Sequence, residues 1–126
     1  MSRDHHYFIK DIKQSCEKII RYTDSLEFKT FCADEVKYDA VIRNLEIIGE
    51  AANNLSRYHP EFIIKYSQIP WEDMYWMRNR ISHGYFSVDF EIVWKTIERD
   101  LPILQKQIQQ IYDHLFSSKS RFSKTD

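Results

Sequence analysis

Apolar residues along most of the chain recur at steps of three or four, which is the spacing of amphipathic helices. The first stripe consists of Phe8, Ile12, Cys16, Ile19 and Ile20. It predicts a helix that runs to about Ser25. The clearest stripe consists of Val41, Leu45, Ile48, Ala52 and Leu55. It follows Asp34, which is suited to cap a helix N-terminus, and it predicts a second long helix. The segment from Leu26 to Ala33 between them is mixed in character.

Two prolines mark the next helix starts. The residue before a proline is disfavoured in α geometry, whereas proline itself fits the first turn of a helix. His59-Pro60 therefore predicts a short helix over Glu61 to Tyr66, and Ile69-Pro70 predicts a longer one over Trp71 to Ser82.

The last predicted helix opens at Asp89, after Gly84 has ended the preceding one in a left-handed conformation. Its apolar positions are Ile92, Val93, Ile97, Leu101, Leu104, Ile108, Ile111 and Leu115. Pro102 must kink this helix or restart it after Asp100, because proline lacks an N–H and its ring meets the preceding turn.

Four long helices with short connections predict an all-α, up-and-down antiparallel bundle with a short extra helix and a proline-kinked last helix. Only two glycines and three prolines occur in 126 residues, fewer than a sheet protein of this length would need for its turns. We assign residues 1–116 to one domain. Residues 117–126, rich in serine and lysine, are expected to form a mobile polar tail.

Composition narrows the possible surroundings and partners. The content of 43% apolar residues is that of a globular chain, and no apolar run is long enough to span a bilayer. The first residues are charged and no apolar leader segment follows them, so we expect a cytoplasmic protein without membrane contact. The formal net charge of −1 gives no general attraction for nucleic acid, so any RNA contact must come from a local cluster.

One short run concentrates the chemistry: Arg78-Asn79-Arg80-Ile81-Ser82-His83-Gly84-Tyr85. Arg78 and Arg80 are permanent cations whose planar donors suit phosphate, and His83 titrates near neutral pH. On an ideal helix Asn79 and His83 are i,i+4 neighbours, so Asn79 would orient the imidazole. The same residue types near a helix C-terminus also simply bond free carbonyls, and spacing alone leaves both interpretations open.

The run resembles the Arg-x4-His-x-Tyr signature of the HepT toxins in the HEPN superfamily, with a polar residue directly after the arginine. Further segments resemble that family in the same order, namely residues 43–51, Ile69-Pro70-Trp71, His83-Gly84-Tyr85-Phe86, Val93-Trp94 and Asp100-Leu101-Pro102. The likeness extends from about Tyr7 to Leu115.

The resemblance implies an HEPN-type bundle that acts as a metal-independent endoribonuclease with Arg78, Asn79 and His83 as catalytic residues. It implies no cofactor and a homodimer in which residues of both subunits face one cleft. It also implies the toxin role in a type VII-like toxin–antitoxin system. The antitoxin would be a minimal nucleotidyltransferase of the MntA type that attaches AMP to the signature tyrosine, here Tyr85.

Residues around the signature are candidates for supporting roles in RNA binding. Arg80 and Ser82 belong to the run itself. Arg43, Glu46 and Glu50 share one side of the second long helix, where they form either a solvated face or a polar stripe that supports the site from the next helix.

Other residue types are interpreted structurally. His5 and His6 are adjacent and so should point apart on a helix, which disfavours a metal site. Cys16 and Cys32 lack a metal or redox spacing and are interpreted as helix-face cysteines. The aromatic residues Trp71, Tyr75, Trp76 and Trp94 lie at helical spacing. They could stack RNA bases, but we interpret them as core.

Two functions remain open at this point. In the first, His83 moves the proton of a ribose 2′-hydroxyl or of the leaving 5′-oxygen, and Arg78 stabilises the phosphorane. In the second, the bundle is a non-catalytic binding module that positions a nucleotidyltransferase, with Arg78 and His83 gripping a nucleotide phosphate.

Overall fold

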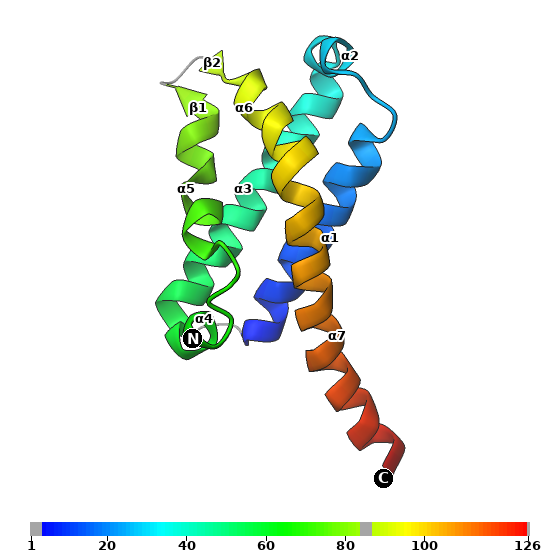
Figure 1. Cartoon of the computed structure of the whole chain (residues 1–126), viewed down its shortest axis with the longest axis vertical. Helices are drawn as coiled ribbons and strands as arrows, with labels where there is room; N and C mark the ends of the chain where they lie inside the picture. Colours follow the sequence, from blue (N-terminus) through cyan, green and yellow to red (C-terminus); the bar gives the residue numbers. More distant parts are fainter. Residues whose placement is uncertain (1–3, 84–86, 126) are drawn as a thin grey trace.

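The computed structural model describes the backbone of residues 4–83 and 87–125, and the side chains of residues 4–77, 80–81 and 88–116. Its four long arms are α1 (His5–Thr23), α3 (Glu35–Tyr58), α5 (Trp71–Ile81) and a continuous last arm of α6 (Phe90–Lys95), η1 (Thr96–Asp100) and α7 (Leu101–Thr125). They run alternately up and down (Figure 1). α1 packs against α3 and α7, and α3 also packs against α5. The predicted all-α antiparallel bundle is confirmed.

The core follows the predicted stripes closely. All five stripe residues of α3 are fully buried, as are Ile12, Cys16 and Ile19 of α1. The prediction is wrong for Ile20, which is 38% exposed. Each helical residue turns about 100° from the one before it, so Ile20 faces outward once Ile19 faces the core.

Aspartates cap three of the long arms. Asp34 Oδ1 accepts a hydrogen bond from the Lys37 N–H at 3.1 Å, and Asp89 Oδ1 accepts one from the Ile92 N–H at 3.1 Å. Both starts agree with the sequence. Asp4 caps α1 by accepting from the His6 N–H at 2.9 Å, so this helix begins three residues before Phe8. Side-chain caps of this kind satisfy free N–H groups of a first turn.

Two short helices fill the connections. α4 (Pro60–Lys65) matches the predicted short helix, with Pro60 in its first turn. α2 (Phe28–Ala33) lies in the segment that the sequence leaves unassigned. Only Phe31 of α2 is fully buried, and its ring centroid lies 5.2 Å from that of Trp94. A single buried residue gives no repeating apolar pattern that could predict a helix from the sequence. The packing of Phe31 against its neighbours stabilises this short helix instead.

The last arm accommodates its proline through a π-helical turn. η1 ends just before α7, and the Leu101 N–H bonds the Thr96 carbonyl five residues back. Pro102 then follows in the first turn of α7, where a missing N–H matters least. The predicted kink is thus a local change of helix type, a common cause of bends in long helices.

A two-stranded ribbon closes one end of the bundle, where the sequence predicts no strands. β1 (Ser82–His83) pairs antiparallel with β2 (Ser87–Val88), with His83 opposite Ser87. The Asp89 N–H also bonds the Ile81 carbonyl at 2.8 Å. The expected role of Gly84 falls on residues 84–86, which lie outside the described residues.

The C-terminal segment continues the path of α7. The helix runs to Thr125 and extends beyond the other arms (Figure 1). It therefore includes most of the segment for which the sequence analysis expects a mobile tail. The mobility itself, like the domain boundary at residue 116, stays a prediction.

Candidate functional site

The signature run crosses from a helix into the ribbon. Arg78 and Asn79 lie on the last turns of α5, and Ser82 and His83 form β1. The side chains of these four residues, and the whole of Tyr85, lie outside the described residues. The backbone nevertheless brings the arginine and the histidine of the signature to one end of the bundle, where α5 meets the ribbon (Figure 1).

The backbone of His83 differs from the sequence expectation. A helical i,i+4 relation between Asn79 and His83 requires α5 to continue through residue 83, but α5 ends at Ile81. His83 is instead extended and paired with Ser87. The position of the His83 backbone thus depends on the ribbon, and sequence periodicity does not predict the pairing of its strands.

Arg80 is the cation of the signature run whose side chain the structure describes. Its guanidinium lies 3.3 Å from the carboxylate of Asp73, and the two side chains are 58% and 65% exposed. An exposed pair of this kind contributes little free energy of folding and is screened by salt. Arg80 is therefore available to an anion such as a phosphate without a large cost to the fold.

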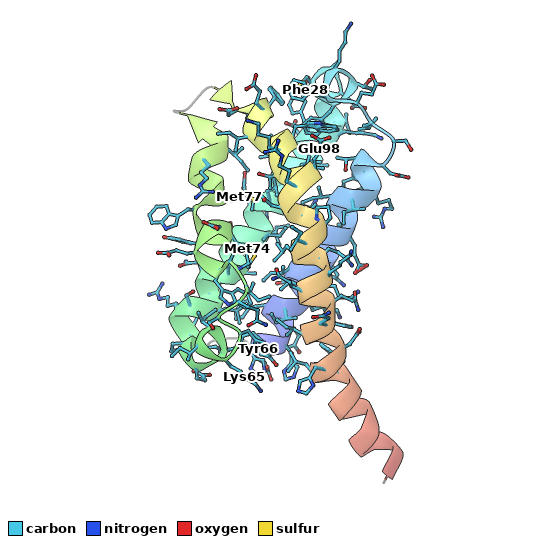
Figure 2. The ribbon with its side chains drawn as sticks, viewed as in Figure 1. Phe28, Lys65, Tyr66, Met74, Met77 and Glu98 are labelled. Carbon is cyan, nitrogen blue, oxygen red and sulfur yellow. The ribbon has the colours of Figure 1, made fainter. Side chains whose placement is uncertain are left out.

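Arg80 also lines a groove between α5 and the last arm, with a volume of about 480 Å³. Met74 and Met77 of α5 contribute to its apolar floor (Figure 2), together with Leu101 and Leu104. Lys95 lines the α6 side of the groove. The groove thus combines apolar contact area with two cations, Arg80 and Lys95, and two carboxylates, Asp73 and Asp100.

The second supporting cluster lies on the other side of α5. Glu46 and Glu50 of α3 border a small hollow of about 50 Å³ together with Tyr75 of α5. Arg43 Nη1 lies 3.6 Å from Glu46 Oε2, and the Arg43 side chain is 63% exposed. The two glutamates thus lie on the seam between α3 and α5, whereas Arg43 extends into solvent.

Gly49 sets the register of that seam. A Cβ atom at Gly49 would lie 3.0 Å from the carbonyl oxygen of Met74, so the two backbones approach more closely than a side chain ordinarily allows. One turn along each antiparallel helix from this contact brings the backbone of residue 78 level with Glu46. The polar stripe of α3 and the signature arginine thus belong to the same level of the bundle.

The aromatic residues divide into two groups. Trp71 is 5% exposed and donates its Nε1–H to the Tyr66 carbonyl at 2.9 Å, so it is a core residue as predicted. Trp94 is only partly buried and packs against the core through Phe31. The prediction is wrong for Tyr75 and Trp76, which are 39% and 46% exposed.

The ring centroids of Tyr75 and Trp76 lie 5.0 Å apart in an edge-to-face arrangement. A signal for their exposure was present in the sequence. The buried positions of α5 are residues 71, 74, 77 and 81, which leaves Tyr75 and Trp76 off the stripe.

The N-terminal histidines also differ from expectation. The rings of His5 and His6 stack, with centroids 4.4 Å apart and an angle of 25° between their planes, rather than pointing apart. Burial lowers the pKa of His5, and the nearby His6 lowers it further. The capping turn allows this stacking, because Asp4 attracts both rings from outside the helix.

The two thiols are not disulfide-bonded and have different surroundings. Cys16 is fully buried, and burial raises its pKa to about 12, which leaves an unreactive neutral thiol. Cys32 is half-buried. The interpretation of Cys16 as a structural cysteine agrees with this. Across the described part of the chain, no helix is both long and apolar enough to cross a membrane.

Comparison with known proteins gives a consistent result. The family model described as "Ribonuclease HepT-like" matches residues 12–111, which include the whole signature run. The chain is 39% identical to a relative from Caldanaerobacter subterraneus subsp. tengcongensis that bears an RNase designation, over 82% of this chain and 90% of the relative.

A protein from Thermococcus cleftensis named as a probable ribonuclease HepT is 38% identical, over 88% of this chain and 98% of its own length. A Methanocaldococcus jannaschii relative with an RNase designation is also 38% identical, over 86% and 88%. No solved structure matches the chain. The fold, the placement of the signature and these matches together show that the chain belongs to the HepT-like ribonuclease family.

Proposed function

We propose that this protein is the toxin of a toxin–antitoxin pair and cleaves RNA without a metal, with Arg78 and His83 as catalytic residues and Asn79 beside them. The observation that carries the proposal is the family match across residues 12–111, which contains the complete Arg-x4-His-x-Tyr run. The common end of α5 and β1 supports it, since it brings the backbones of these residues together.

The proposed chemistry is transfer of the phosphodiester to the neighbouring ribose oxygen. The 2′-hydroxyl loses its proton to an imidazole and attacks phosphorus, the bond to the 5′-oxygen breaks, and the leaving oxygen gains a proton. Arg78 stabilises the charge on the phosphorane. The products are a 2′,3′-cyclic phosphate and a free 5′-hydroxyl.

A homodimer would supply both proton transfers. One imidazole can act as base while the other acts as acid when a two-fold axis brings two copies of His83 to one cleft. The exposed Tyr75 and Trp76 support a dimer that buries this side of α5, because large aromatics are typical of interface centres.

The groove and the stripe would serve the same site. Arg80, with Ser82 beside it in the run, would bind phosphates that flank the cleaved bond. Glu46 and Glu50 on the α3–α5 seam would position the signature arginine, and Arg43 would contact RNA from the solvent side.

Inactivation would use Tyr85. A nucleotidyltransferase antitoxin of the MntA type would attach AMP to its hydroxyl. The added phosphate would pair with Arg78 and Arg80 and the purine would fill the cleft, so inhibition would be electrostatic and steric together.

A second candidate function is a non-catalytic module that holds the nucleotidyltransferase. The net charge of −1 favours it, as do the exposed acids Glu72 and Asp73 on α5, because they weaken the attraction of RNA. In this case Arg78 and His83 would bind nucleotide phosphate rather than cleave RNA.

The deciding experiment is digestion of single-stranded RNA by the purified chain in EDTA, with end analysis of the products. We expect cyclic-phosphate and 5′-hydroxyl ends, and loss of cleavage in Arg78→Ala and His83→Ala. Matched controls are Arg57→Ala and His114→Ala, which remove exposed residues of the same types elsewhere. A pure wild-type protein that cuts no RNA but binds the nucleotidyltransferase would reject the nuclease and support the binding module.

A further inference from the structure

A cluster of one carboxylate and two imidazoles lies at the end of the bundle opposite the ribbon (Figure 1). It consists of Asp4, His5 and His6, at the start of α1, and each residue offers a ligand atom within 4.8 Å of the others. None of these residues belongs to the signature.

One carboxylate oxygen organises the cluster. Asp4 Oδ1 lies 2.5 Å from His6 Nδ1 and 3.5 Å from His5 Nδ1, and it also accepts the His6 backbone N–H. The cap bond and both ring contacts of Asp4 use this same oxygen, Oδ1. A cation that bound the second oxygen, Oδ2, would leave the helix cap intact.

Aromatic residues from distant parts of the chain hold the two imidazoles. His5 packs on Phe62 of α4 at 4.8 Å between ring centroids and meets the edge of His59 at 5.6 Å. His6 meets the edge of Phe116 of α7 at 5.6 Å. The His5 and His6 side chains are only 30% and 20% exposed. Walls of this kind limit the rotamers of the rings, which lowers the entropy lost when a ligand binds.

We propose that Asp4, His5 and His6 form a binding site for a divalent transition-metal ion, with Zn²⁺ as the natural probe. Two imidazoles and a carboxylate are a ligand set that zinc and copper favour over magnesium or calcium. The stacked rings must tilt toward the carboxylate to place both nitrogens about 2.1 Å from one ion. Water completes the coordination.

The expected consequence is structural. An ion here would fix the first turn of α1 against the rings of α4 and α7, and the stabilisation of the folded chain would rise with the logarithm of the ion concentration above Kd. It would take no part in the reaction at the signature, because the two sites lie at opposite ends of the bundle (Figure 1).

The test is a Zn²⁺ titration of the full chain without an affinity tag, followed by calorimetry and thermal melting. We expect one saturable equivalent and a rise in Tm of about 5 °C when free Zn²⁺ is about ten times Kd. His6→Gln should weaken binding by roughly tenfold or more. Asp4→Asn should also weaken it while keeping a good N-cap, because asparagine caps as well as aspartate.

Two control variants make the result specific. His114→Gln removes an exposed histidine of α7, and Cys32→Ser removes the half-buried thiol. Both should bind Zn²⁺ like the wild type. The absence of saturable binding, equal losses in His6→Gln and His114→Gln, or loss only in Cys32→Ser would each overturn the site.

Discussion

The two ends of this bundle carry histidines in sequence runs of opposite charge. At the ribbon end, His83 follows α5 in a run that contains Arg78 and Arg80, so an anion is the favoured ligand. At the other end, His5 and His6 face the carboxylate of Asp4, so a cation is favoured. Under the two proposals, the same side chain would serve proton transfer at one end and metal ligation at the other, and its neighbours would decide which.

The largest expected difference between the two ends is in how RNA cleavage responds to loss of a histidine and to removal of metal ions. We expect His83→Ala to lower the rate of RNA cleavage by about 10²–10⁴, because it removes a general acid–base group. EDTA should leave the rate unchanged in the wild type, and His6→Gln should cleave normally. Loss of cleavage in EDTA that Mg²⁺ restores would mean that the ribbon end also needs a cation, and the contrast would fail.

Substitution of Tyr85 tests whether the ribbon end receives the negatively charged AMP group. Tyr85→Phe should cleave RNA at close to the wild-type rate, because a phenol with a pKa near 10 stays protonated at pH 7 and is a poor general acid or base there. It should also escape silencing by a co-expressed nucleotidyltransferase. Intact mass would show AMP on the wild type and none on the variant. A modified and silenced Tyr85→Phe protein would place the acceptor elsewhere.

The dimer prediction tests whether the ribbon end is shared between two chains. Light scattering should report about twice the 15.4 kDa mass of one chain. Trp76→Glu should weaken the dimer by roughly tenfold or more, because it puts a charge on an exposed aromatic beside the signature. Ile103→Glu, at a 61% exposed position of α7, is the matched control. If only Ile103→Glu dissociated the dimer, the interface would instead lie at the groove between α5 and α7, which Ile103 lines.

Sequence reasoning succeeds for features that the residue types and their spacing along one helix determine. The stripe of α3 and the caps Asp34 and Asp89 come directly from residue type and spacing, and they define the bundle. The resemblance of the signature run leads to the family that the comparisons confirm. These features are local, so pattern and propensity are sufficient for them.

Features that depend on distant contacts escape the sequence. α2 is held by packing of Phe31 on Trp94, and the ribbon depends on the pairing of His83 with Ser87. The stacked rings of His5 and His6 depend on a capping turn and on aromatic walls from α4 and α7. No period in the sequence encodes such contacts, so the prediction that these rings point apart fails.

The smallest effect concerns Gly49, which lies on the α3–α5 seam, one turn from the level of residue 78. A Cβ atom there would lie 3.0 Å from the Met74 carbonyl oxygen, so α3 and α5 must separate by a few tenths of an ångström. Overpacking of this kind costs about 1–3 kcal/mol. Alanine recovers up to about 1 kcal/mol through its helix propensity. We therefore expect Gly49→Ala to lower the free energy of unfolding by about 1 kcal/mol net.

The two ends should respond differently to Gly49→Ala. RNA cleavage should fall several-fold, because residue 78 lies one turn from the contact and catalysis is sensitive to small displacements. Zn²⁺ binding by Asp4, His5 and His6 should match the wild type. Urea melts, cleavage rates and zinc titrations of the same preparation would report all three quantities, with Ser56→Ala, an exposed position of α3, as the control. A Gly49→Ala protein as stable and active as the wild type would show that the seam yields freely and does not position the signature.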